Sequence, residues 1–158
     1  MNWELPACKA TMKITDAFVA EHAVIHVQLD HLEYAIPAAK TLGEVKVMAA
    51  LLEAALRPHA EAEDELLFNG LEPGLDQMGK LEKVQHEHDA ICKGLEQVQV
   101  ARFKKDAQKR LLNIVRLTRK EFDLEDRILF RMAEELLREE TLIKLGKSWA
   151  RKRIAPAK

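Results

Sequence analysis

The chain has 158 residues, a length that can bury one core, so we expect a single domain over residues 1–158. It is 47% hydrophobic and 32% charged with few glycines and prolines, a composition that favours helices over sheets. The formal net charge of −1 gives no general reason to expect nucleic acid as a partner, and no apolar run approaches the ~18 residues of a membrane span.

The first half of the chain predicts two helices behind an N-terminal arm. Residues 1–12 show no clear apolar period, and we expect them to lie as an arm on the fold. From Ile14 apolar positions recur every three or four residues, which predicts a helix that ends before Pro37. The segment TLGE at residues 41–44 has the form of a capping box, and it opens a second helix that ends at Asn-Gly, residues 69–70.

The second half predicts another two helices. The third covers about residues 77–98, and the fourth begins near Phe103 and continues towards Leu137. Short loops between consecutive long helices make neighbours antiparallel. We therefore predict an all-α fold, an up-down-up-down antiparallel four-helix bundle whose core covers about residues 14–137.

The C-terminal part predicts a short extra helix around Leu142, which would cover one end of the bundle. Residues 144–158 form a basic tail. We interpret this tail as a solvated end that aids solubility.

Two pairs of segments are near copies of each other. HAEAEDELLF at residues 59–68 matches EFDLEDRILF at residues 121–130, and in both a residue of a metal-ligand type stands four positions before Glu. Residues four apart share one helix face. EHAVI at residues 21–25 likewise matches EHDAI at residues 87–91. The chain therefore reads as a duplicated helix pair.

Folding the two helix pairs together would point six side chains at one centre: His22, His59, Glu63, His88, Glu121 and Glu125. Burying carboxylates among apolar residues is costly unless each is paired or coordinates a metal. We therefore predict a two-metal site, against the alternative of a polar, hydrogen-bonded core. Imidazole and carboxylate ligands suit iron, manganese or zinc. Glu63 and Glu125 are placed to bridge two metals, and the other residues would be terminal ligands.

Neighbouring residues leave alternatives open. His86 lies about 200° from His88 around the helix, so both cannot face the site, and the match to residues 21–25 selects His88. His26, one turn after His22, is an additional ligand, a group that orients a ligand or water, or a buried hydrogen-bonded residue. Its counterpart Cys92 reads as a small buried apolar side chain.

Three further residues stand next to the predicted ligands. Asp64 and Asp126 occupy equal positions in the repeat, so they either support a neighbouring helix by a hydrogen bond or are solvated, which is the plainer interpretation. Pro58 should bend the second helix just before His59, which either aims that ligand inward or is a tolerated kink.

The order His, His-x-x-x-Glu, His, and a final pair ending in Glu resembles the hemerythrin-like (HHE cation-binding) family of four-helix bundles. The resemblance covers about residues 14–137. It implies two iron ions per chain, carboxylate-bridged and oxo- or hydroxo-bridged, with manganese or zinc as alternatives. It supports five of the six ligands. Glu121 is the exception, because the family usually has His there, and its assignment rests on spacing alone.

What the resemblance implies about function is broad: the metal pair would bind or react with oxygen, peroxide or nitric oxide. An anionic Glu121 should favour ferric iron, which points away from reversible oxygen carriage. The alternative is a metal- or oxygen-responsive sensory module without turnover, so whether the protein is an enzyme stays open, as does its oligomeric state. The N-terminal residues lack a signal-peptide pattern and the two cysteines are too few for a disulfide framework, so we expect a cytoplasmic protein.

Overall fold

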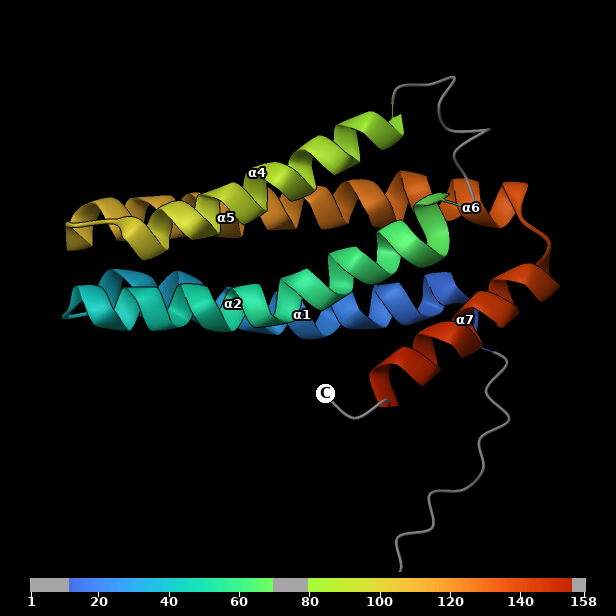
Figure 1. Cartoon of the computed structure of the whole chain (residues 1–158), viewed down its shortest axis with the longest axis horizontal. Helices are drawn as coiled ribbons and strands as arrows, with labels where there is room; N and C mark the ends of the chain where they lie inside the picture. Colours follow the sequence, from blue (N-terminus) through green and yellow to red (C-terminus); the bar gives the residue numbers. More distant parts are fainter. Residues whose placement is uncertain (1–11, 70–79, 155–158) are drawn as a thin grey trace, which may run out of the picture.

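The structure is a computed structural model and describes residues 12–69 and 80–154 (Figure 1). Its regular elements in these ranges are all helical. Four long helices form the bundle: α1 (Ile14–Ala38), α2 (Leu42–Glu63), α4 (Lys80–Val100) and α5 (Lys104–Leu124). Figure 1 shows the α1–α2 pair lying along the α4–α5 pair. The predicted all-α four-helix bundle is confirmed.

Local sequence explains where α1 ends and α2 begins. Thr41 Oγ1 accepts a hydrogen bond from the Glu44 amide at 3.1 Å, and the Glu44 carboxylate accepts one from the Thr41 amide at 3.4 Å, as the capping box predicted. The prediction that the first helix stops before Pro37 was wrong, since α1 continues to Ala38. Pro37 lies in the last turn, and Gln108 Nε2 donates to the carbonyl of Ile36 at 2.7 Å, which supplies a partner to a helix end.

A π-helical turn lies within each of the two repeated segments, residues 59–68 and 121–130. Segment η1 (Asp64–Phe68) continues α2, and segment η3 (Glu125–Leu129) continues α5 before α6 (Phe130–Leu136). Such turns contain one extra residue and are frequent at functional sites. Their positions in the two copies differ by one residue, so the duplication extends approximately to the backbone geometry.

The last described element, α7 (Glu139–Ile154), packs across α1 and near η1 (Figure 1). Leu142 and Gly146 are buried, so the helix expected around Leu142 is present and longer than predicted. The basic tail is helical as far as Ile154 and packs on the bundle through one face, while its Lys and Arg residues in that range are exposed as expected. Its last residues, 155–158, lie outside the described residues, as do the predicted arm up to residue 11 and residues 70–79.

The interior contains two apolar clusters with a polar layer between them. One cluster joins the four long helices and includes Leu29, Leu52, Leu95 and Leu111. The other surrounds the π-helical turns and includes Phe18, Phe68, Leu129 and Leu142. Buried His and Glu side chains occupy the positions between these clusters. None of the helices in the described ranges is long and apolar enough to cross a membrane.

Candidate metal centre

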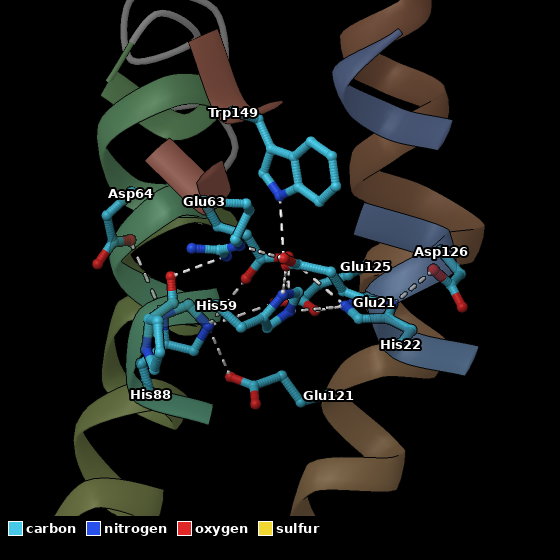
Figure 2. Close-up of polar contacts among 12 residues, drawn as sticks. Glu21, His22, His59, Glu63, Asp64, His88, Glu121, Glu125, Asp126 and Trp149 are labelled. Carbon is cyan, nitrogen blue, oxygen red and sulfur yellow. Dashed lines mark hydrogen bonds and ion pairs between the residues drawn. The ribbon is translucent and has the colours of Figure 1, made fainter. Parts of the chain in front are cut away.

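The polar layer brings together all six side chains that the sequence singled out (Figure 2). They come from every long helix of the bundle: His22 from α1, His59 and Glu63 from α2, His88 from α4, Glu121 from α5 and Glu125 from η3. Glu63 and Glu125 are 0% exposed, and the most exposed side chain of the set, His88, is 10% exposed. Ionisable groups at such depth need compensating charge or ligands.

One group of ligand atoms lies on the α1–α2 side of the layer. His22 Nε2 is 2.9 Å from His59 Nε2, and His59 Nε2 is 3.2 Å from Glu63 Oε1. His22 Nε2 is also 3.3 Å from Glu125 Oε2. These four atoms can therefore surround one cation.

A second group gathers around His88. Its Nε2 atom is 3.2 Å from Glu121 Oε1, 3.4 Å from Glu125 Oε1 and 3.5 Å from Glu63 Oε2. Glu63 and Glu125 thus turn one oxygen to each group. Each of these two carboxylates therefore faces both ligand groups.

The spacing of these atoms fits metal coordination. Ligand atoms about 2.1 Å from one ion lie about 3.0 to 3.4 Å apart in octahedral or tetrahedral geometry, close to the separations seen here. Both carboxylate oxygens of Glu63 and of Glu125, and Oε1 of Glu121, have no hydrogen-bond partner among the described residues. A cation pair would give these buried oxygens the partners that burial requires.

Carboxylates hold the outer nitrogens of the histidine rings. His22 Nδ1 lies 2.8 Å from Asp126 Oδ1, and His59 Nδ1 lies 2.7 Å from Glu21 Oε2 (Figure 2). Such bonds orient a ring so that Nε2 faces a metal. The plainer interpretation of Asp126 as a solvated charge was therefore wrong. Asp64 Oδ1 is more distant, at 3.8 Å from His88 Nδ1.

Glu21 is the functional candidate that sequence reasoning missed. The sequence did contain an indication of its role, because Glu precedes His at residues 21–22 and again at residues 87–88. A helix places neighbouring residues about 100° apart, so a carboxylate beside a ligand histidine can only reach an imidazole on another helix. Glu21 does this by bonding to His59 of α2, and that pairing depends on how α1 packs against α2.

The cluster is strongly coupled electrostatically. Burial lowers the pKa of the imidazoles, but the facing carboxylates outweigh it and raise the pKa of His22 and His88 to about 11 and that of His59 to about 9. Burial raises the pKa of Glu121 to about 8, with Glu125 and Glu63 reinforcing it against the pull of His88. Protons and a metal ion therefore compete for these imidazoles, because a nitrogen must give up its proton to coordinate a metal.

The other histidines and the cysteine lie outside the cluster. His86 is exposed, in agreement with the choice of His88. His26 is not among the grouped ligand atoms of the described residues, and its Nδ1 lies 3.4 Å from Arg119 Nη1. Cys92, expected to be buried, is only partly so, and burial raises the pKa of its thiol.

A small cavity adjoins the cluster. It has a volume of about 20 Å³, and its lining includes Leu56, His59, His88, Cys92, Leu95 and Glu121. A volume of this size holds about one water molecule. The space that this cavity leaves beside the cluster is therefore small.

Comparison with known proteins agrees with this geometry. The family model described as the hemerythrin HHE cation binding domain matches residues 13–141, which include the bundle and all six clustered side chains. Neither the comparison with curated proteins nor that with solved structures found a match.

Proposed function

Because the chain belongs to the hemerythrin HHE cation-binding family, we propose that its His/Glu cluster holds two iron ions that bind or react with oxygen, peroxide or nitric oxide. The observation that carries this proposal is the division of Glu63 and Glu125, each with one oxygen in either ligand group. A single ion in either group would contact only one oxygen of each of these carboxylates. Manganese or zinc pairs are the alternatives.

Each residue of the centre has a definite role in this proposal. His22 and His59 would hold one ion, His88 and Glu121 the other, and the two shared carboxylates would fix the distance between them. Asp126 and Glu21 keep two of the imidazoles oriented through their Nδ1 atoms. A bound iron pair would supply redox chemistry and an open coordination position for a small molecule.

Aromatic rings pack against two of the ligand histidines. The Phe122 ring stacks on His22 with centroids 3.8 Å apart, and the Phe18 ring meets His59 edge-on at 5.7 Å. The small cavity is lined by His59 together with His88 and Glu121. We expect small molecules to reach the metal pair through this cavity.

The ligand set favours redox chemistry over reversible oxygen carriage. Three carboxylates bring more negative charge than a histidine-rich set, and negative charge stabilises Fe(III) relative to Fe(II). Peroxide turnover or metal sequestration fits this better than carriage. A metal-responsive sensory module is the second candidate, favoured by a hydrogen bond that links Glu21 to Trp149 of α7.

Metal analysis of protein purified without chelator tests the proposal, with about two irons per chain expected. No bound metal, or a single ion, would contradict it. Adding hydrogen peroxide or oxygen to the iron-loaded protein then separates the two candidate functions. Catalytic consumption supports the redox function, whereas a change in stability alone supports the sensory module.

A further inference from the structure

Glu21 connects the metal centre to the C-terminal helix (Figure 2). Its Oε2 accepts a hydrogen bond from His59 Nδ1 at 2.7 Å. Its Oε1 accepts one from Trp149 Nε1 at 2.9 Å and one from Arg153 Nε at 2.6 Å. The two oxygens of one carboxylate thus join a candidate ligand on α2 to two side chains of α7.

Arg153 also contacts the backbone beside the same ligand. Its Nη2 donates to the Pro58 carbonyl at 3.1 Å, one residue before His59. Its guanidinium lies 5.8 Å from the centre of the Trp149 ring, so the two side chains support each other. Lys152 adds an ion pair with Glu65 of η1. Helix α7 is therefore fixed against the centre through several independent polar contacts.

Of the three candidate ligand histidines, His59 is the one whose carboxylate partner bonds to α7 in the described part of the chain. Asp126 and Asp64 face the outer nitrogens of His22 and His88, with side chains 34% and 43% exposed, against 17% for Glu21. Of these three carboxylates in the described part of the chain, Glu21 is the one that bonds to the Arg153 cation and the Trp149 indole. Arg153 thus partly neutralises the carboxylate that polarises His59.

We propose that Trp149 and Arg153 are positioning residues of the metal centre, which act through Glu21 to set the orientation and donor strength of His59. The inference rests on the proposed function, and it makes α7 a part of the centre rather than a cover for the end of the bundle. Binding linkage is reciprocal. Metal binding at His59 therefore strengthens the docking of α7, and loss of metal weakens it.

The direction of each effect follows from charge and restraint. Removing the Arg153 cation leaves the negative charge of Glu21 uncompensated. This charge favours the oxidised metal and so lowers the reduction potential of the metal. Removing either donor also frees Glu21 to move, so His59 is held less firmly and the metal binds more weakly. Outer hydrogen-bond partners of ligands change metal affinity by about 10- to 100-fold. Trp149 and Arg153 act one contact further out, so we expect roughly 3- to 10-fold.

The experiment compares variants of the full-length chain. Arg153→Met keeps most of the side-chain length and removes the charge, and Trp149→Phe keeps an aromatic ring and removes the N–H group. Arg151→Met is the matched control, because Arg151 is exposed on the same helix and its side chain donates a hydrogen bond to Ser148. Dissociation constants for Fe(II) under anaerobic conditions and reduction potentials are measured for each. Hydrogen exchange of the α7 amides is followed with and without metal.

The expected result is weaker binding of one ion and unchanged binding of the other in both test variants, with a lower potential in Arg153→Met. Arg153→Lys should restore part of the potential, since it keeps the charge, and it remains informative if a larger change unfolds α7. Metal should protect the α7 amides in wild type and protect them less in the test variants.

Two results would overturn the inference, and they have different consequences for the proposed function. Wild type that binds two ions, with Arg153→Met and Trp149→Phe unchanged in affinity and potential, would exclude the role of α7 while leaving the proposed function intact. Wild type that binds no metal would exclude both.

Discussion

At the scale of single residues, Glu121 has the strongest influence on the chemistry we propose. It is the position where the chain carries a carboxylate although the resemblance leads one to expect histidine. Its Oε1 lies 3.2 Å from His88 Nε2 and has no hydrogen-bond partner among the described residues. Glu121→His should raise the reduction potential, because a neutral ring replaces an anion. Glu121→Ala should lower the metal content towards one ion per chain.

Metal analysis and redox titration of these two variants and wild type check the prediction. If Glu121→Ala keeps both ions, Glu121 is not a ligand. If neither substitution changes the reduction potential or the reactivity, Glu121 does not disfavour reversible oxygen carriage.

Glu63 and Glu125 should be the most costly ligands to remove. Each divides its oxygens between two groups, so Glu63→Ala or Glu125→Ala should release both ions, whereas His88→Ala should affect mainly one. Glu61→Ala is the matched control, since Glu61 is exposed on α2. The iron content per chain of each variant shows which substitution removes more metal. Equal losses in Glu63→Ala and His88→Ala would argue against a shared carboxylate.

The sequence was sufficient to choose His88 over His86, but it was not sufficient to find the hydrogen-bond partners of the candidate ligand histidines. His88 was preferred over His86 because an internal repeat gives the register of a helix without knowledge of its neighbours. Asp126 and Glu21 act on histidines of other helices, across sequence separations of 104 and 38 residues. Such partners depend on the rotation of packed helices, which apolar periodicity defines only roughly. The ligand assignment itself stays a prediction.

At the scale of elements, the packing of α7 rests on a close backbone approach. A Cβ atom on Gly146 would collide with the carbonyl oxygen of Met12, whereas a Cβ on Gly43 would meet only Thr41 Oγ1 at 3.8 Å. Gly146→Ala should therefore destabilise the protein by about 1–3 kcal/mol, a cost typical of overpacking. Gly43→Ala should stabilise it by up to about 1 kcal/mol, because Ala is the better helix former.

Chemical denaturation of both glycine variants measures these changes. Because Gly146 lies one turn from Trp149, the Gly146→Ala variant should also lose protection of the α7 amides against hydrogen exchange. A fully protected α7 in that variant would show that the close approach is not needed for docking.

The sequence predicted some features of the helices correctly and did not reveal others. The capping box located the start of α2, because it depends on residues close together in the chain. The π-helical turns η1 and η3 were not foreseen, since the sequence of either segment is equally compatible with α-helix. The length of α7 was underestimated because its anchors, Trp149 and Arg153, contact residues far away in sequence.

At the scale of the whole molecule, the bundle was predictable because one hydrophobic period runs through each long helix, and short connections allow few topologies. The polar layer interrupts that period at equivalent places in the helices. The fold therefore places its most polar interior between two apolar clusters. Metal binding and folding should be coupled in such a molecule, and pH should act on both.

The metal-free protein should lose stability as pH rises above neutrality. The pKa values of His22, His59 and His88 are about 11, 9 and 11 in the folded chain, above the usual 6.5. The stability they contribute is fully present below pH 6.5 and is lost as pH rises through the folded values. Glu121, whose pKa is raised from 4.5 to about 8, acts in the same direction.

Two carboxyl groups act at the other end of the pH range. Imidazole and guanidinium partners outweigh burial and lower the pKa of Glu21 to about 2, and the imidazoles hold the pKa of Glu63 well below its usual value. The stability that these two contribute is present above pH 4.5 and is lost as pH falls through the folded pKa values. The metal-free protein should therefore be most stable near pH 4.5, because ionisation of Glu121 already lowers its stability above that pH.

Metal should reverse this trend on the alkaline side. A metal ion takes the place of the protons on the imidazoles, so its binding releases protons and strengthens as pH rises. The rise in melting temperature on metal loading should thus be small near pH 5 and large near pH 8, since stabilisation by a ligand grows with its affinity. Thermal melts at pH 5, 6.5 and 8, with bound metal and after chelation, measure both curves. A metal-free protein that becomes more stable from pH 6.5 to 9 would show that the imidazoles are neutral in the core, and a metal effect independent of pH would show that metal binds elsewhere.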